Sequence, residues 1–133
     1  DNVKVFLANM GPIPQHKPRA DFSTGFFEVA AFEALKNDGF ETTADAAAAA
    51  RESGADVVVI CSTDATYPDI VPPLAKELKE TMPNATVILA GAPPKELEPV
   101  YREAGVDDFV SVKANCYQIL RSLQEKKGMK PNV

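Results

Sequence analysis

The sequence predicts an α/β fold in which a five-stranded parallel sheet is covered by helices on both faces. Short apolar runs of strand length alternate along the chain with longer stretches of helical periodicity. The run Val57–Cys61, almost entirely β-branched, is typical of a buried central strand. Three helix-to-strand junctions share one form, a glycine that ends a helix just before a strand: Asp38-Gly39-Phe40, Ser53-Gly54-Ala55 and Ala104-Gly105-Val106.

The first predicted strand and helix are separated by a proline-rich loop. Residues 3–9 form an apolar run interrupted only by Lys4, as expected of a parallel strand covered on both faces. The loop Met10–Pro18 follows. From Ala20 to Asn37 apolar residues recur at helical spacing, and Gly39 can end this helix in the left-handed conformation.

The next segments give a short strand, a helix and the central strand. Phe40–Thr42 is predicted as the second strand. Thr43 can cap the alanine-rich helix Ala44–Ser53, which Gly54 ends. Val57–Cys61 is then the third strand.

A third helix carries an apolar stripe from Ile70 to Met82. Pro68 suits its first turn, whereas Pro72 is expected to bend or delay the helix. The remaining predicted elements are, in order, strand 86–90, helix 97–104, strand 109–112 and helix 115–126.

Residues 1–127 are thus predicted to form one α/β domain, and residues 128–133 a loose C-terminal tail. Right-handed crossovers favour the flavodoxin-like (Rossmann-like) strand order 2-1-3-4-5, with a switch point between strands 1 and 3. Asp1, directly before the first strand, indicates a segment of a longer protein.

Composition excludes several classes of partner. The chain has 133 residues and a net charge of −5, so we expect no nucleic-acid or anionic-membrane surface, which would need clustered Lys and Arg. No apolar stretch reaches membrane-spanning length, and no signal peptide is evident, which favours a cytoplasmic protein. Cys61 and Cys116 are expected to be reduced.

In this fold the loops after strands 1, 3, 4 and 5 form the ligand-binding edge. His16, the only histidine, could bind a metal or transfer a proton. No carboxylate lies near it in the loop, so a histidine in solvent or at an interface is favoured.

Two other ligand chemistries are disfavoured. Asp64 and Lys113 invite comparison with receiver domains, but the acidic pair that would hold magnesium after strand 1 is replaced by Asn9-Met10. The prolines of the first loop remove the backbone donors that a flavin phosphate would need.

Six segments together resemble the C-terminal cobalamin-binding domain of methylmalonyl-CoA mutases. The resemblance spans about residues 3–126 and is specific as an ensemble. The segments are Val5–Gly11, Gly39–Thr42, Ala55–Ser62, Val71–Leu74, Val87–Gly91 and Gly105–Phe109.

Cobalamin-binding members of that family carry Asp-x-His-x-x-Gly after strand 1, in which the histidine ligates cobalt. Matching Met10-Gly11 to the Met-Gly before this motif puts Ile13, Gln15 and Pro18 in place of its three residues. His16 falls one position too late and is only a weak candidate for cobalt.

The other two cofactor loops of the family are also altered. Ser-x-Leu after strand 3 becomes Cys61-x-Thr63, and Gly-Gly after strand 4 becomes Ala90-Gly91. We therefore expect no bound cofactor, no metal and no catalytic residue in this domain, and we expect Met10–Pro18 to be a rigid plug over the vacated crevice.

This pattern resembles the small (beta) subunit of the heterodimeric mutase. The resemblance implies a non-catalytic structural role, with the large (alpha) subunit and the N-terminal barrel of its own chain as partners. The parent holoenzyme would use adenosylcobalamin to interconvert succinyl-CoA and methylmalonyl-CoA. The alternatives are a functional cobalamin-binding module of an acyl-CoA mutase, using His16 or base-on binding, and a receiver-like signalling domain.

Overall fold

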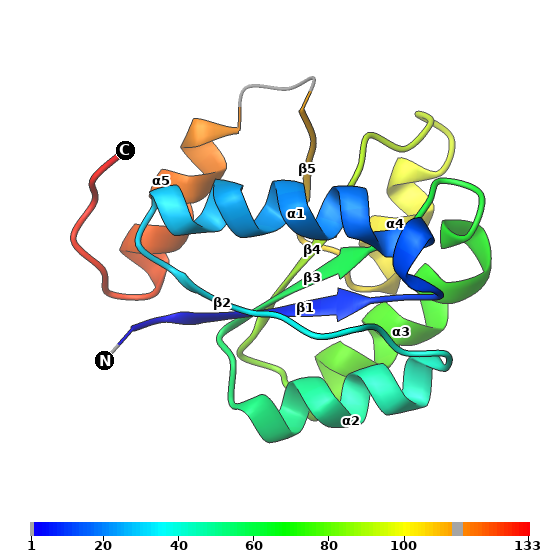
Figure 1. Cartoon of the computed structure of the whole chain (residues 1–133). Helices are drawn as coiled ribbons and strands as arrows, with labels where there is room; N and C mark the ends of the chain where they lie inside the picture. The colour runs from blue at the N-terminus through cyan, green and yellow to red at the C-terminus, as the bar shows by residue number, and fades with distance from the viewer. Residues whose placement is uncertain (1, 113–115) are drawn as a thin grey trace.

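A computed structural model of the chain shows five parallel strands in one sheet, in the order β2-β1-β3-β4-β5 (Figure 1). It describes residues 2–112 and 116–133. The strands are β1 Lys4–Asn9, β2 Glu33–Leu35, β3 Val57–Cys61, β4 Thr86–Ala90 and β5 Asp108–Val110. The helices are α1 Ile13–Val29, α2 Thr43–Ser53, α3 Tyr67–Thr81, α4 Glu98–Ala104 and α5 Tyr117–Lys126. The predicted fold class and strand order are confirmed.

The helices form two layers, one on each face of the sheet. Helices α1 and α5 cover one face, and α2, α3 and α4 cover the other (Figure 1). Alternate side chains of β1 enter the two cores, Val5 and Leu7 on the α1 side and Phe6 and Ala8 on the α2 side. Strands β1, β3 and β4 are buried on both faces and are apolar along most of their length, which is why the sequence reveals these three strands so well.

Helix α1 begins and ends earlier than the predicted range 20–37. Pro12 has the extended conformation of an N-cap residue, and Pro14 lies in the first turn, where a missing N–H leaves no helical hydrogen bond unmade. Prolines that indicate a loop therefore begin the helix instead.

Helix α1 ends in a hydrogen-bonded turn without a glycine. The amide of Ala31 donates to Glu28 O at 3.0 Å and that of Phe32 to Phe27 O at 3.2 Å, as in a Schellman motif. Ala31 has φ +66° and is the only described non-glycine residue with positive φ. The end of the helix is missed in the sequence because the left-handed position carries alanine.

The substitution Ala31→Gly is expected to raise the free energy of unfolding by roughly 0.5–1 kcal/mol, since glycine adopts the left-handed region without strain. The control is Ala48→Gly, at an exposed position inside α2, which should lower it by about 1 kcal/mol. Urea unfolding measures both, and a loss of stability in both variants would contradict strain at Ala31.

The early end of α1 also moves the second strand. The predicted strand 40–42 is wrong: β2 is Glu33–Leu35 and pairs with residues 4–6 of β1. Phe40 forms only an isolated bridge with Met10. The strand follows the helix end directly, so its position depends on where α1 stops.

Helices α2 and α3 show smaller differences. Thr42, not Thr43, caps α2 by accepting a hydrogen bond from the Asp45 amide at 3.1 Å. Gly54 ends α2 with φ +68°, as predicted. Helix α3 begins at Tyr67 with Pro68 in its first turn, so Pro72 inside the helix does not delay it.

Near the C-terminus, β5 ends at Val110 rather than at residue 112, and the predicted start of the last helix, Asn115, lies outside the described residues. Residues 128–133 lie against α1 and α5. Asn132 Nδ2 donates to Val29 O at 3.2 Å, and Gln124 Nε2 donates to Ala30 O at 2.8 Å. These amides satisfy carbonyl groups at the end of α1. No described helix is long and apolar enough to cross a membrane.

Candidate functional site

The carboxyl edge of the sheet is where open α/β folds bind ligands. Strands β1, β3, β4 and β5 end there at Asn9, Cys61, Ala90 and Val110. The sequence predicts the candidate site in the loops that follow these residues. The structure brings the described parts of those loops together.

The connection from β1 to α1 is only three residues long, Met10–Pro12. Ile13, Gln15 and Pro18, the positions that the resemblance matches to the cofactor motif, lie on the first turns of α1 and are exposed. The prediction of a loop over Met10–Pro18 is corrected, because Ile13–Pro18 forms the start of α1. The side chains that close this edge come from elsewhere.

His16 is buried, which corrects its predicted place in solvent or at an interface. Its ring is 3% exposed, and Nδ1 lies 3.0 Å from Gly11 O. A carbonyl oxygen only accepts, so Nδ1 carries the proton. A Cβ atom on Gly39 would lie 2.5 Å from His16 Cε1. His16 thus fastens the start of α1 to the segment between β2 and α2.

Replacing Gly39 by alanine is expected to lower the free energy of unfolding by about 1–3 kcal/mol, because φ is +108° and the added Cβ meets the His16 ring. Gly25→Ala is the matched control. Gly25 lies in α1 with no atom within 4 Å of the added Cβ, so this variant should gain about 0.5–1 kcal/mol. Thermal unfolding of the two variants tests the close packing of Gly39 against His16. Equal unfolding midpoints for Gly39→Ala and Gly25→Ala would refute this packing.

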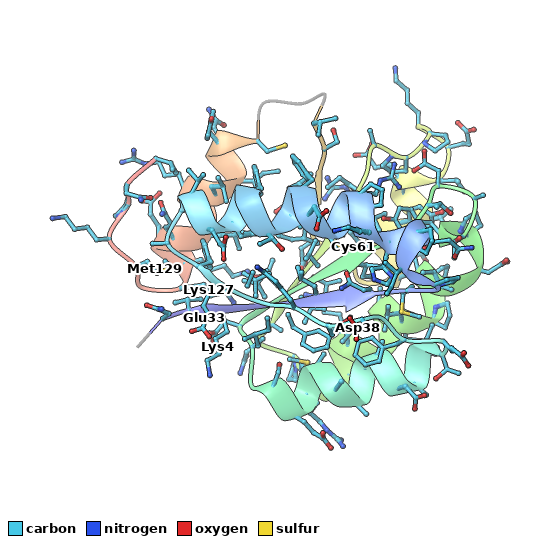
Figure 2. All side chains as sticks on the ribbon, in the orientation of Figure 1. Lys4, Glu33, Asp38, Cys61, Lys127 and Met129 are labelled. Carbon is cyan, nitrogen blue, oxygen red and sulfur yellow. The ribbon has the colours of Figure 1, made fainter. Side chains whose placement is uncertain are left out.

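The two altered residues at and just after the end of β3 have structural contacts. Cys61 is fully buried between the sheet and α1, with Sγ 3.6 Å from Ser23 Oγ (Figure 2). Burial raises the pKa of the Cys61 thiol to about 12, so the group is neutral and is not a thiolate ligand at physiological pH. Thr63 Oγ1 lies 2.7 Å from Thr66 Oγ1 and accepts from the Thr66 amide, which fixes the turn before α3.

Tyr67 joins the ends of two strands. Its side chain is buried, and its hydroxyl accepts from the Ser62 amide at 3.0 Å and donates to Ala90 O at 2.5 Å. Burial raises the pKa of the phenol, which stays protonated. Ser62 Oγ donates to Met10 O at 2.9 Å. The carboxyl ends of β1, β3 and β4 are thereby linked by hydrogen bonds.

Arg19 reaches from α1 across this network. Its Nη1 donates to Ser62 O at 3.0 Å and lies 2.8 Å from Asp64 Oδ1, and its guanidinium lies 5.4 Å from the centre of the Tyr67 ring. Burial lowers the pKa of Arg19, but Asp64 and Tyr67 outweigh it and raise the pKa overall. A Cβ on Gly91 would lie 3.3 Å from both Arg19 Nη1 and Tyr67 Cε2. The space beside Gly91 is therefore taken by these two side chains.

Two neighbouring small cavities at this edge lie beside Arg19 and Asp64. One, of about 280 Å³, is lined by Ala90, Gly91 and Val110 among others. The second, of about 310 Å³, is lined by Gln15 and Thr63 among others. Three residues line both cavities: Pro18, Arg19 and Asp64.

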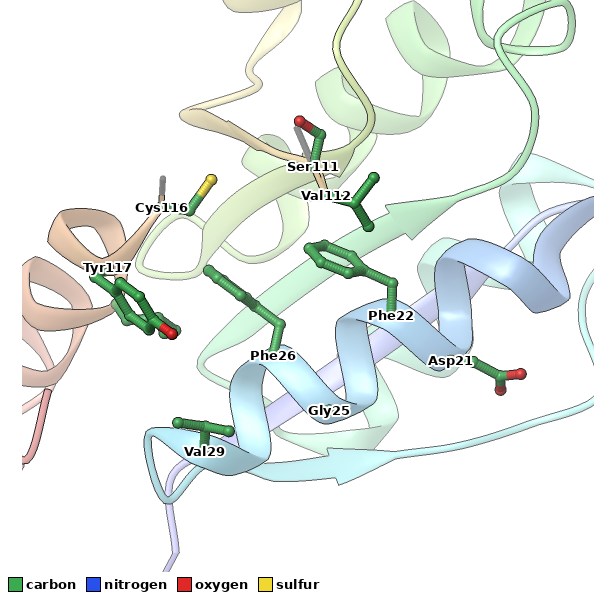
Figure 3. A pocket seen from close by; sticks show the side chains of 10 residues that line it. Asp21, Phe22, Gly25, Phe26, Val29, Ser111, Val112, Cys116 and Tyr117 are labelled. Carbon is green, nitrogen blue, oxygen red and sulfur yellow. The ribbon is translucent and has the colours of Figure 1, made fainter. Parts of the chain in front are cut away.

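A larger groove of about 590 Å³ lies between α1 and α5 (Figure 3). Phe22 and Phe26 extend from α1 into it, facing Val112 and Tyr117 on the other side. Val112 is 78% exposed and Tyr117 60% exposed. The groove is a solvent-open apolar surface.

The edge lacks the carboxylate cluster of a receiver site among the described residues. Asn9, at the end of β1, donates to Asn37 Oδ1 at 3.2 Å, and Asp64 pairs with Arg19. The part of the chain that the structure describes holds no cluster of three metal-ligating His, Cys, Asp or Glu side chains. Lys113, the other receiver candidate, lies outside the described residues.

Neither Arg19 nor Tyr67 was predicted to have a role at this edge. The position of Arg19 could be predicted only from the correct start of α1. When the helix begins at Ile13, Arg19 lies one turn before Ser23, which faces the sheet. Arg19 therefore lies on the side of the helix that faces the strands. Reading the prolines as a loop hides this register.

Curated relatives support the predicted resemblance. The chain is 31% identical over 128 residues to the methylmalonyl-CoA mutase small subunit of Porphyromonas gingivalis, and 29% identical over 126 residues to that of Streptomyces virginiae. Each match covers 95% of this chain but only 20% and 19% of the respective relative. The chain thus spans about one fifth of the length of the relatives it matches, and its similarity to mutase small subunits is confirmed.

Solved structures support the fold alone. A CheY-like protein from Pseudomonas aeruginosa matches with a TM-score of 0.70 at 18% identity, over 98% of both chains. A response regulator from Thermotoga maritima matches with a TM-score of 0.66 at 15% identity, over 96% of this chain and 99% of that one. No family model matches the chain.

Proposed function

We propose that this chain is part of the small subunit of a methylmalonyl-CoA mutase and serves its assembly, not its chemistry. The observation that carries the proposal is the carboxyl edge, where Arg19 and Tyr67 occupy the place in which this fold binds ligands. The similarity to mutase small subunits supports the choice of this enzyme as the parent protein.

The partners in this proposal are the large subunit and the remainder of the small subunit. About four fifths of the length of each relative lies outside the part that this chain matches. A domain with a complete core of its own can supply a rigid surface to such neighbours. The heterodimeric and cytoplasmic character of the enzyme forms part of the same proposal.

The donor atoms at the carboxyl edge do not fit a cobalt-ligating cobalamin site. Gln15 carries an amide, which is a weak ligand, on the exposed face of α1. His16 is buried, with Nδ1 held by Gly11 O. Cys61 is a neutral thiol in the core. The proposal therefore assigns adenosylcobalamin to the holoenzyme and not to this domain.

Two measurements test the proposal. The encoding gene's full product is co-expressed with the mutase large subunit of the same organism, with and without residues 4–126, and purified through a tag on the large subunit. Removal should reduce recovery of the small subunit at least about tenfold. Removal of residues 128–133 alone is the control and should leave most of the complex.

The isolated chain is also titrated with hydroxocobalamin, and its visible spectrum should stay unchanged up to about 100 μM. Equal recovery of the complex without residues 4–126 would overturn the assembly role. Micromolar binding abolished by His16→Ala would establish a cobalamin-binding module in its place.

A further inference from the structure

We infer that Arg19, held by Asp64 and lying over Tyr67, bars a corrinoid from the carboxyl-edge crevice independently of the missing cobalt ligand. This inference rests on the proposed function, since it explains why such a domain stays empty. It makes a distinct claim: restoring the metal-binding motif alone does not restore binding.

Arg19 lies between two small cavities at the carboxyl edge of the sheet. The cavities of about 280 and 310 Å³ share Pro18, Arg19 and Asp64 as common walls. Pockets for drug-sized ligands run from about 300 to 1,000 Å³, and a corrin with its nucleotide tail is larger than a typical drug. Each cavity lies near the lower end of that range. Arg19 is the longest of the three side chains shared by the two cavities, so shortening it removes the main barrier between them.

Tyr67 gives Arg19 a fixed surface to rest on. Its hydroxyl is held by the Ser62 amide and Ala90 O, so the ring cannot swing aside without breaking two buried hydrogen bonds. Gly91 lies on the other side of this pair, with room only for a hydrogen where a Cβ would meet Arg19 and Tyr67 at 3.3 Å. The absence of a side chain at Gly91 therefore leaves room for Arg19 and Tyr67.

Arg19 can be removed at a moderate cost to the fold, mainly the loss of its hydrogen bond to Ser62 O, worth about 1 kcal/mol. Its partner Asp64 is 63% exposed, and exposed ion pairs contribute only about 0–1 kcal/mol. The side chain of Arg19 is itself 29% exposed. Arg19→Ala retains a good helix former in α1, so the variant should fold.

The experiment introduces the cobalt-binding motif of the family into this chain, once with Arg19 in place and once with Arg19 replaced by alanine. Four proteins are compared: the unmodified chain, Arg19→Ala, the triple variant Ile13→Asp, Gln15→His, Pro18→Gly, and the triple variant combined with Arg19→Ala. Each is titrated with hydroxocobalamin, followed by its visible spectrum and by retention of colour on desalting. We expect binding only in the combined variant, at least about 100-fold tighter than in the triple variant.

The matched control adds Arg121→Ala to the triple variant, which removes an equal charge from an exposed ion pair on α5 and should not allow binding. Circular dichroism confirms folding. If the triple replacement does not fold, Gln15→His alone replaces it, since Gln15 is exposed.

Equal binding by the motif-restored protein with and without Arg19 would overturn the inference, as would no binding by the folded combined variant. Either result leaves the assembly role to be decided by the co-expression experiment, which does not depend on Arg19. Binding by the unmodified chain would instead refute the proposed function.

Discussion

Replacing Tyr67 by alanine is expected to lower the free energy of unfolding by about 3–5 kcal/mol. The ring is 2% exposed and packs in the core between the sheet and the α2–α3 layer. Its removal leaves a cavity, and it also leaves the Ser62 amide and Ala90 O without their partner. The hydrogen bonds through which Tyr67 joins the ends of β3 and β4 would be lost.

Tyr67→Phe separates the hydrogen bonds from the packing and should cost about 1–3 kcal/mol. Tyr101→Phe is the matched control. Tyr101 is also buried, at 1% exposure, but its hydroxyl has no hydrogen-bond partner among the described residues. Loss of that hydroxyl should leave stability unchanged or slightly higher.

Urea unfolding of the three variants measures the differences. Equal losses in Tyr67→Phe and Tyr101→Phe would show that the hydroxyl of Tyr67 does not hold the strand ends together. A loss confined to Tyr67→Ala would assign its whole contribution to packing.

Stability is expected to fall at alkaline pH because Cys61 is buried as a neutral thiol. Its pKa rises from an ordinary value of 9.0 to about 12 in the folded chain. Above pH 9 the unfolded chain loses this proton while the folded chain keeps it. The stabilising contribution is therefore complete below pH 9 and is lost as the pH rises toward 12. At about 1.4 kcal/mol per pKa unit, the loss approaches about 4 kcal/mol.

The Tyr67 phenol, whose pKa burial also raises, acts in the same direction. Urea unfolding at several values between about pH 8 and 11 measures the slope of the unfolding free energy against pH. Cys61→Ala is less stable at neutral pH but should show a flatter slope. An identical slope in this variant would mean that Cys61 ionises normally in the folded chain.

The absorption of tyrosinate gives an independent check on the alkaline prediction. Burial raises the pKa of the Tyr67 phenol, so in the folded protein it should ionise only at the alkaline end of the titration. Tyr67→Phe should therefore remove absorption from that end. If the earliest titrating group disappears instead, the burial of Tyr67 is contradicted.

The central features of the fold were predictable because they are encoded locally. Strands β1, β3 and β4 are buried on both faces, so each is a continuous apolar run. Gly54 and Gly105 follow the ends of α2 and α4 and indicate where those helices stop. The strand order follows from right-handed crossovers between such strands.

The limits of α1 were not predictable in the same way. Its first turn contains prolines, which are equally at home in a loop. Its last turn places alanine where glycine would indicate an end, and Gln124 and Asn132 satisfy the free carbonyls from the far end of the chain. The position of β2 depends on that helix end and was wrong for the same reason.

Sequence patterns were enough to predict the strand order and the edge at which a site would lie, and they led to the match of Ile13, Gln15 and Pro18 to a cobalt-binding motif. They could not predict how that edge is closed. Arg19, Ser62 and Tyr67 belong to different elements, and their hydrogen bonds form once α1 packs beside β3. Local periodicity records which side of an element is buried, but contacts between distant polar side chains exist only in the assembled fold.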